Sequence, residues 1–310
     1  MHIVITEFMD EPAVAALSRR FDVRYDPQLV DARDELLQAC AAADALIVRN
    51  RTRVDAALLA AAPKLRAVGR LGVGLDNIDV QACRARDIAV LPATGANARA
   101  VAEYVIATAL VLLRGAYTHS HEVAAGKWPR NALSGGLEAA GRTLGIVGFG
   151  GIGQLTAQLA RGLGMRVVAH DAMVDAAAPI WTQTGVEPVA LDDLLARSDV
   201  VTLHIPLTAE TAGLLDASRL ARMKPGAILI NTARGGIVDE SALAQALRSG
   251  ALGGAAIDVF DQEPLPAGSP LADAPNLILT PHIAGLTREA NERVSSLVAQ
   301  RVAQALGSNL

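Results

Sequence analysis

Short apolar runs alternate with amphipathic segments along most of the chain. In the first hundred residues, strand-length apolar runs occupy 2–8, 44–49 and 65–70, and helical spacing occupies 11–19 and 54–62. In the second half, the pattern predicts strands at 143–147, 166–170, 200–204, 227–231, 254–259 and 277–280. Strands that alternate with helices are typical of parallel sheets in an α/β fold.

Two long helices are predicted beside this alternation. Residues 98–113 form an almost uncharged helical pattern, and residues 285–306 form another after the last predicted strand. Residues 119–138 are rich in glycine and polar residues, which predicts a connector.

Composition narrows the class of protein. A length of 310 residues with 51% hydrophobic content predicts two globular domains. The formal charge of −4 argues against nucleic acid as a partner, and without an apolar run of 18 residues we expect no membrane partner. Cys40 and Cys83 show neither metal-ligand nor disulfide spacing, and residues 1–10 do not resemble a signal peptide. We therefore expect a cytoplasmic protein without a metal.

A glycine-rich turn is the strongest local signal. Gly148, Gly150 and Gly153 match the pattern G-x-G-x-x-G between a predicted strand and a predicted helix at 154–163. Such a turn lets the backbone approach a pyrophosphate at a helix N-terminus. Asp171 ends the next predicted strand, where an acidic residue binds the ribose hydroxyls and repels a 2′-phosphate. These residues predict NAD rather than NADP as cofactor.

Three polar residues follow predicted strands farther along the chain. Arg234, Glu263 and His282 lie at the carboxyl ends of strands, where ligands bind in open α/β sheets. Each also has a structural interpretation: a surface charge, a solvated turn residue and a structural histidine. A histidine can act as a base, an acidic residue can orient it, and an arginine can bind a carboxylate.

Ordered motifs extend this pattern over nearly the whole chain. They are residues 69–79 (GRLGVGLDNID), 97–103, 148–153, 204–208 (HIPLT), 231–235 (NTARG), 258–264 (DVFDQEP) and 281–285 (PHIAG). With them the chain resembles the D-isomer-specific 2-hydroxyacid dehydrogenases, in their phosphoglycerate-dehydrogenase-like branch. The resemblance implies that Arg234, Glu263 and His282 are the catalytic triad of an NAD-dependent enzyme.

The resemblance also implies binding residues. For the cofactor they are Gly148, Gly150, Gly151, Ile152, Gly153, Asp171, His204, Pro206, Thr211, Thr232, Ala233, Asp258 and Gly285. For the substrate they are Arg49, the backbone of Leu71, Gly72, Val73 and Gly74, and Asn97. Gly151 departs from the arginine that is frequent in the family, which removes one expected phosphate contact. The chain ends soon after its last predicted helix, so we expect no serine feedback through a C-terminal regulatory domain.

The resemblance implies a divided architecture as well. A flavodoxin-like substrate domain is expected at 1–97 plus 283–310, with a Rossmann dinucleotide-binding domain inserted at 98–282. The helices that begin near Ala98 and Gly285 are expected to link the two and to act as hinges. The family implies a homodimer.

Three arginines bear on the substrate. Arg49, Arg51 and Arg53 alternate after a predicted strand, so an extended segment would place them on one face. Such a face suits a small 2-hydroxy acid with a second anionic group, and a solvated basic loop is the alternative. Residues 7–11 (EFMDE) and 48–52 (VRNRT) are similar to the (S)-sulfolactate dehydrogenases of this branch. Sulfolactate, 3-phosphoglycerate and D-lactate-type acids remain candidates.

A different class of function remains open on the sequence. Some relatives in this fold family are NAD(H)-sensing corepressors that keep the same motifs. Turnover of 2-keto acids with NADH distinguishes the enzyme from the sensor.

Overall fold

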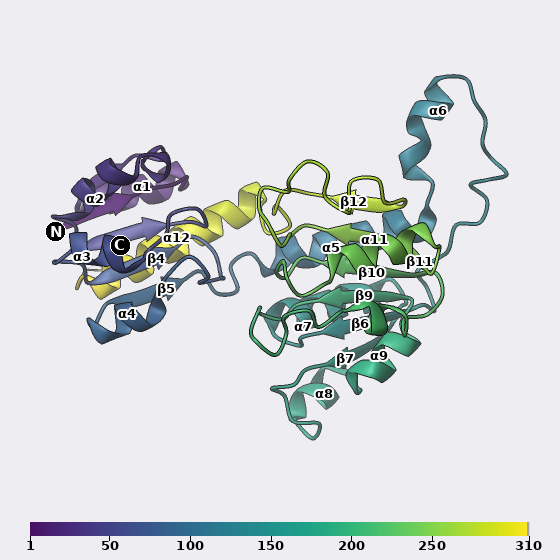
Figure 1. Cartoon of the computed structure of the whole chain (residues 1–310). Helices are drawn as coiled ribbons and strands as arrows, with labels where there is room; N and C mark the ends of the chain where they lie inside the picture. Colours follow the sequence, from purple (N-terminus) through teal and green to yellow (C-terminus); the bar gives the residue numbers. More distant parts are fainter. Residues whose placement is uncertain (309) are drawn as a thin grey trace. The chain divides into compact units, whose positions relative to one another are not determined.

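The computed structural model describes residues 1–308 and 310. The chain forms two compact units, residues 1–97 with 286–310 and residues 98–285. The smaller unit is built on five parallel strands (Figure 1): β1 (His2–Ile5), β2 (Asp22–Tyr25), β3 (Ala45–Val48), β4 (Ala67–Arg70) and β5 (Ala89–Pro92). Their order, β2-β1-β3-β4-β5, is the flavodoxin-like order.

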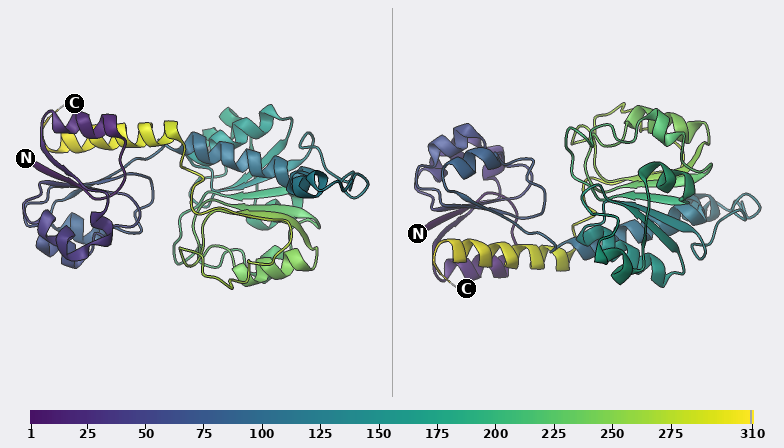
Figure 2. Two further views of the ribbon diagram at one scale, coloured as in Figure 1. Left: turned by 90° about the horizontal axis from the view of Figure 1, so that it is seen from above. Right: turned by 90° about the horizontal axis from the view of Figure 1, so that it is seen from below.

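Helices cover both faces of this sheet (Figure 2). On one face, α1 (Glu11–Ser18) and α12 (Arg288–Ala305) pack on Ile3 and Ile5. On the other face, α2 (Arg33–Cys40), α3 (Ala56–Ala61) and α4 (Val80–Ala85) pack on Val4, beside the 3₁₀ turn η1 (Leu29–Asp31). Alternate side chains of one strand enter opposite faces, so both sheet faces must be apolar.

The larger unit holds a parallel sheet of seven strands: β6 (Thr143–Val147), β7 (Arg166–His170), β8 (Glu187–Pro188), β9 (Val200–Leu203), β10 (Ala227–Asn231), β11 (Leu252–Ile257) and β12 (Leu277–Leu279). The order is β12-β11-β10-β9-β6-β7-β8. The order reverses between β6 and β9, which is the topological switch point of a Rossmann fold, where dinucleotides bind.

Helices also cover both faces of the larger sheet. The helices α5 (Ala98–Arg114), α7 (Gly151–Gly162) and α8 (Pro179–Thr184) share one core cluster. The opposite cluster contains α9 (Leu191–Arg197), α10 (Ala217–Leu220) and α11 (Glu240–Arg248). After α5, the chain leaves the body of this unit through η2 (Tyr117–His119) and α6 (Ser120–Ala124), as the projecting segment in Figure 1 shows.

The predicted fold class, two parallel-sheet α/β domains with a Rossmann and a flavodoxin-like order, is confirmed. Several element predictions are wrong at the edges. The strands β2, β5 and β8 carried no clear apolar run, and the 119–138 connector contains α6. The last helix begins at Arg288 rather than at 285, because the Thr287 side chain accepts a hydrogen bond from the Ala290 amide and caps it. Within the residues described, no helix is long and apolar enough to span a membrane.

Candidate active site

The glycine turn joins β6 to α7 at the switch point. Gly148 has φ +96°, and a Cβ there would meet the His204 carbonyl oxygen at 2.4 Å. A Cβ on Gly153 would meet the Gly148 carbonyl oxygen at 2.3 Å. These two positions therefore exclude side chains, and they fix the close approach of helix and strand.

The space above the turn is open. A Cβ on Gly150 or Gly151 would meet nothing within 4 Å, and Gly150 precedes the first residue of the 12-residue helix α7. Thr232 Oγ1 is buried without a hydrogen-bond partner among the residues described. An open glycine cradle at a helix N-terminus and an unsatisfied buried hydroxyl both fit a bound dinucleotide.

Asp171, directly after β7, fixes the backbone of the glycine turn. Its Oδ2 accepts a hydrogen bond from the Phe149 amide at 2.7 Å, and its Oδ1 accepts one from the Met173 amide at 2.8 Å. Phe149 is itself buried and stacks on Trp181, with 4.8 Å between ring centroids. The carboxylate predicted to select NAD therefore also anchors the backbone of the glycine turn.

The candidate base and its acid are in direct contact. His282 Nδ1 lies 2.8 Å from Glu263 Oε2, and the two side chains are 38% and 34% exposed. Because a carboxylate only accepts hydrogen bonds, Nδ1 carries the proton and Nε2 keeps a free lone pair. The Glu263 Oε1 atom accepts from the Phe260 amide at 3.1 Å, which fixes the carboxylate. This is the arrangement that a histidine base requires.

Asp258 holds the turn that carries His282. Its Oδ1 accepts from Thr280 Oγ1 at 2.6 Å and from the Ile283 amide at 2.8 Å, and its Oδ2 accepts from the Ala284 amide at 2.8 Å. The Asp258 carbonyl accepts from the His282 amide at 2.8 Å. His282 has φ +56°, a left-handed conformation that few residues adopt unless the surroundings hold them. The resemblance predicted Asp258 as a cofactor contact; the structure adds this positioning role.

Helix α5 extends this network. Tyr104 OH lies 2.6 Å from Thr280 Oγ1, whose single proton goes to Asp258. Thr280 therefore accepts from Tyr104, and the donors run from Tyr104 through Thr280 to Asp258. Burial raises the pKa of Tyr104, and its hydrogen bond to Thr280 opposes that effect.

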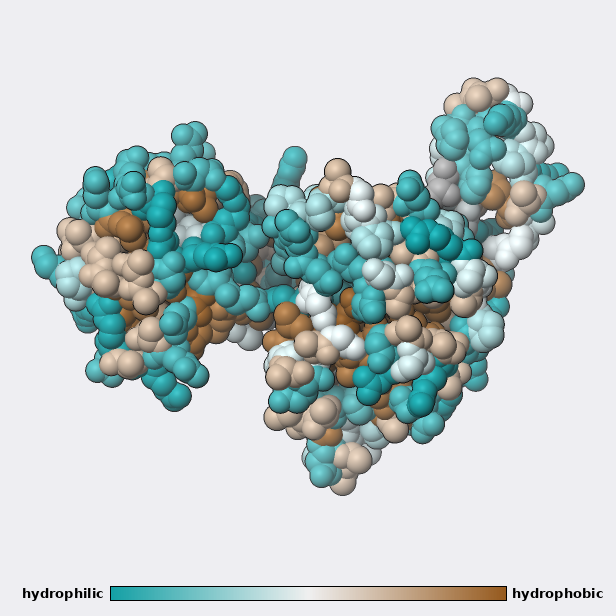
Figure 3. Space-filling model, viewed as in Figure 1, coloured by the Kyte–Doolittle hydropathy of each residue, from teal (hydrophilic) through white to brown (hydrophobic). Residues whose placement is uncertain are grey.

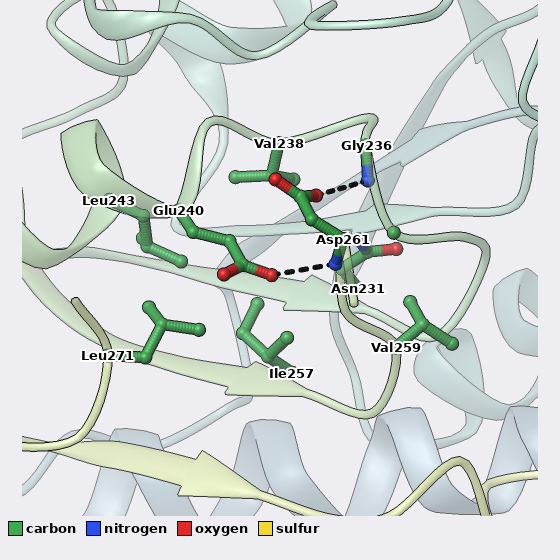
Figure 4. Close-up of a pocket in the computed structure, with 10 residues that line it drawn as sticks. Asn231, Gly236, Val238, Glu240, Leu243, Ile257, Val259, Asp261 and Leu271 are labelled. Carbon is green, nitrogen blue, oxygen red and sulfur yellow. Dashed lines mark hydrogen bonds between the residues drawn. The ribbon is translucent and has the colours of Figure 1, made fainter. Parts of the chain in front are cut away.

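The Arg234 turn is fastened to the Glu263 turn (Figure 4). The Gly236 amide donates to Asp261 Oδ1 at 2.6 Å, and the Asp261 amide donates to Glu240 Oε1 at 2.9 Å. Burial raises the pKa of Glu240, and the Asp261 amide opposes it. A Cβ on Gly235 would meet the Phe260 carbonyl oxygen at 1.9 Å, so the two turns are in backbone contact. The cavity behind them is about 10 Å³, which holds a water molecule and no organic ligand.

Within the larger unit, the remaining predicted cofactor residues occupy the same strand ends. The Ala233 amide donates to Asn231 Oδ1 at 3.0 Å, and Thr211 Oγ1 donates to the Pro206 carbonyl at 2.7 Å. Desolvation lowers the pKa of His204 to about 4, so it is neutral at pH 7. Ile152 lies in the first turn of α7, and Gly285 is the last residue of this unit.

The expectation that three arginines share one face is wrong. Residues 50–52 form a bend after β3 rather than an extended strand. Arg49 Nη2 donates to Asn291 Oδ1 at 2.7 Å, and its guanidinium lies 5.7 Å from the Phe8 ring centroid. Arg51 instead forms an exposed ion pair with Asp31. Arg49 and Arg51 therefore do not form one basic face, and Arg49 remains a candidate for binding the substrate.

The backbone donors predicted at 71–74 are also fewer than expected. The Leu71 amide donates to the Val48 carbonyl and the Gly72 amide to the Arg70 carbonyl, each at 2.8 Å. Both amides are therefore used within the fold. Within the described part of the chain, the amides of Val73 and Gly74 have no recorded partner, and Asn97 Oδ1 is buried without one. The backbone donors predicted for the substrate carboxylate in the smaller unit therefore narrow to the amides of Val73 and Gly74, and Asn97 Oδ1 is a buried acceptor rather than a donor.

In each of the two units, residues that contact the predicted ones were not predicted themselves. Glu7, Asn291, Thr280, Tyr104, Asp261 and Glu240 all bond to predicted residues or to their turns. The position of Glu7 at the end of the first apolar run is a signal that could have identified it, since polar residues at strand ends are candidates for a site. The others become visible only when distant turns are brought together.

Comparisons with known proteins agree with this geometry. The family model described as the NAD binding domain of D-isomer specific 2-hydroxyacid dehydrogenases matches residues 106–284. The chain is 57% identical over 305 residues to an (S)-sulfolactate dehydrogenase from Chromohalobacter salexigens, covering 98% of both chains.

Two further relatives widen the comparison. A D-3-phosphoglycerate dehydrogenase from Mycobacterium tuberculosis is 44% identical over 98% of this chain, which spans 56% of that protein. A glyoxylate reductase structure from Paecilomyes thermophila superposes with a TM-score of 0.88 at 31% identity, over 100% of this chain and 97% of that one. The chain belongs to the D-isomer specific 2-hydroxyacid dehydrogenase family and is an NAD-dependent oxidoreductase of small 2-hydroxy acids.

Proposed function

We propose that His282 is the general base of hydride transfer, with Glu263 as its orienting acid. The contact of 2.8 Å between His282 Nδ1 and Glu263 Oε2 is the observation that carries this proposal. With Nδ1 protonated, Nε2 accepts the proton of the substrate hydroxyl, and the imidazolium that forms is stabilised by the adjacent carboxylate. Bound NAD would supply the hydride acceptor for C2 of the substrate.

Arg234 holds the substrate carboxylate in this proposal. A guanidinium presents two parallel donors to a carboxylate and stays charged at every working pH. The bonds from Gly236 to Asp261 and from Asp261 to Glu240 fix the turn on which Arg234 stands, which supports this role. The glycine turn, Asp171, Thr232 and Asp258 are proposed to hold the dinucleotide.

The substrate carries a second anionic group in this proposal, and Arg49 binds it. Arg49 is half-buried, and burial lowers the pKa of its guanidinium. A desolvated guanidinium held by a neutral amide and an aromatic ring retains free donors for an anion. The similarity to an (S)-sulfolactate dehydrogenase and to D-3-phosphoglycerate dehydrogenases supports a sulfonate or a phosphate as that group.

A panel of 2-keto acids tests this proposal. The kcat/KM for reduction with NADH is expected to be at least tenfold higher for sulfopyruvate and 3-phosphohydroxypyruvate than for pyruvate, since a hydrogen-bonded ion contact contributes that much. Equal kcat/KM values for the three acids would contradict the role of Arg49. Tight NADH binding without turnover of any acid would indicate the sensor instead, an alternative that the dehydrogenase and reductase relatives do not support.

We also propose a homodimer. The segment that projects from the larger unit exposes Tyr117 (65%) and Trp128 (78%), together with Val123 and Leu137. Figure 3 shows mixed apolar and polar residues on the visible face of this projection. Exposed aromatic side chains on a projecting segment are typical of an interface between copies. Light scattering of the purified protein should give twice the chain mass, and a monomer would refute the proposal.

We also propose that the protein is located in the cytoplasm. Both cysteines are buried and free, and burial raises the pKa of the Cys40 thiol to about 11. Unpaired thiols suit a reducing compartment. Fractionation of the source cells should recover the NADH-dependent activity with cytoplasmic markers; recovery with a membrane or external fraction would contradict it.

A further inference from the structure

The buried carboxylate of Glu7 binds the backbone amides of Arg49, Arg51 and Thr52, and we call these contacts the Glu7 cradle and residues 49–52 the Arg49 segment. Glu7 follows β1 and is 5% exposed. Its Oε1 accepts from the amides of Arg49 at 2.8 Å and Thr52 at 3.0 Å, and its Oε2 accepts from the amide of Arg51 at 3.1 Å. Both oxygens act only as acceptors, which is the bonding of an ionised carboxylate. A negative charge is therefore built into the base of this segment.

The groups that the Arg49 guanidinium contacts are uncharged. Its guanidinium donates to Asn291 Oδ1 at 2.7 Å and to the Phe8 carbonyl at 3.4 Å, and it lies over the Phe8 ring. The charge of Glu7 opposes the fall in the pKa of Arg49 that burial causes. Arg51, the next cation along the segment, is paired with Asp31. An anion at Arg49 would therefore meet that guanidinium together with the fixed charge of Glu7 and the buried cation Arg70, which lies opposite Val48 on the neighbouring strand β4.

We propose that Glu7 is a specificity-determining residue that shifts the preference of the second-anion site from a doubly charged phosphate toward a singly charged sulfonate. The inference rests on the proposed function, in which Arg49 binds that group. Both the attraction to Arg49 and the repulsion from Glu7 double when the charge of the ligand doubles, so Glu7 reduces the advantage that a doubly charged phosphate gains from Arg49, while a sulfonate and a phosphate offer the same tetrahedral set of acceptor oxygens. Asn291 supplies a neutral contact that serves either group.

The charge of the ligand can be changed without changing the protein. A phosphate monoester loses its second proton near pH 6, whereas a sulfonate keeps one negative charge throughout. The measurement is kcat/KM for 3-phosphohydroxypyruvate divided by that for sulfopyruvate, with NADH, from pH 8 to pH 5.5. Titration of enzyme groups that serve both acids cancels in this ratio. As the pH falls, we expect the ratio to fall at least threefold more in Glu7→Gln than in the wild type, because the second charge of the phosphate gains more from Arg49 when the anion of Glu7 is absent; the same pH dependence in both proteins overturns the proposal.

Two variants change the charge of the site in opposite directions. Glu7→Gln keeps an acceptor oxygen for the Arg49 and Thr52 amides, and it should raise the phosphate-to-sulfonate ratio at pH 8 about threefold or more. Asn291→Asp adds a carboxylate beside Arg49 without disturbing the cradle, and it should lower the ratio. Glu35→Gln is the matched control, because it removes an exposed carboxylate of the same unit that pairs with Arg24. An unchanged ratio in Asn291→Asp and in folded Glu7→Gln overturns the proposal.

Failure of this inference differs from failure of the proposed function. Arg49→Gln should lower kcat/KM for both anionic acids relative to pyruvate. If Arg49→Gln does so while the phosphate-to-sulfonate ratio and its pH dependence are the same in Glu7→Gln as in the wild type, only the role of Glu7 is wrong. If Arg49→Gln leaves the preference over pyruvate unchanged, Arg49 does not bind the second anion, and both proposals fall.

Discussion

The two units hold their functional side chains in different ways. In the larger unit, three carboxylates of the segment after β11 bind neighbouring turns: Asp258 and Asp261 fix residues near His282 and Arg234, and Glu263 contacts His282 itself. In the smaller unit, one buried carboxylate, Glu7, holds three backbone amides, and Arg49 is left with an amide and a ring. The proposed catalytic groups are thus preorganised by a network of hydrogen bonds, whereas selectivity for the second anion depends on few charges. Substitutions in the two units should therefore have different effects.

The largest expected effect lies in the larger unit. His282→Ala removes the proposed base and should lower kcat about 10²- to 10⁴-fold for every 2-hydroxy acid alike. The measurement is the steady-state rate with several acids, with NADH binding followed by fluorescence as the control. A loss confined to acids with a second anion would place His282 in recognition rather than in chemistry.

The preference for NADH over NADPH provides the next test of the larger unit. Asp171→Asn keeps an acceptor for the Phe149 amide at the glycine turn but removes the charge. We expect the preference for NADH over NADPH to fall roughly ten- to a hundredfold, since a hydrogen bond to a charged group is lost and the repulsion of a 2′-phosphate is relieved. The measurement is the ratio of kcat/KM for the two cofactors. An unaltered ratio would show that Asp171 serves only the turn.

The chain of hydrogen bonds from Tyr104 through Thr280 to Asp258 predicts a smaller effect on kcat. Thr280→Val breaks the chain of bonds from Tyr104 to Asp258 and leaves the Tyr104 hydroxyl without its acceptor. A drop in kcat of about tenfold is expected with NADH affinity retained, because the His282 turn loses one of its fixed contacts. Thr184→Val, which loses only a local bond to the Ile180 carbonyl, is the matched control. Equal rates for the two variants would refute preorganisation by this chain of bonds.

The smallest effect is on stability. The folded protein lowers the pKa of His204 to about 4 from 6.5, so folding opposes its protonation. Stability is therefore complete above pH 6.5 and is lost as the pH falls toward 4, by about 2 kcal/mol at pH 5. His204→Gln should reduce the difference in thermal midpoint between pH 7 and pH 5. An identical pH dependence in both proteins would show that His204 does not titrate in this way.

The sequence predicted the strands best where both faces are buried. The strands β6, β7 and β10 have the predicted bounds, because strands buried on both faces are continuous apolar runs. The edge strand β2 (DVRY) is half-exposed and β8 has two residues, so neither has such a run. Boundaries set by a single side chain, such as the Thr287 cap of α12, are likewise hidden from periodicity.

The sequence predicted which residues belong to the candidate site, but it did not predict how they contact one another. Motif spacing identified Glu263 and His282, but their pairing depends on how the turns after β11 and β12 fold. Spacing misled for Arg51, because a bend directs its side chain to Asp31. It also could not show that the Leu71 and Gly72 amides bond to neighbouring strands, since those partners are distant or defined by the turn itself.

The division of roles between the two units is tested most directly by one variant on two substrates. In Arg49→Gln, kcat/KM should fall about thirtyfold or more for sulfopyruvate, because a charged contact to the second anion is lost. For pyruvate, which lacks that group, it should stay within about threefold of the wild type. Equal losses on the two acids would contradict the account, since they would place Arg49 in the common chemistry rather than in recognition of the second anion.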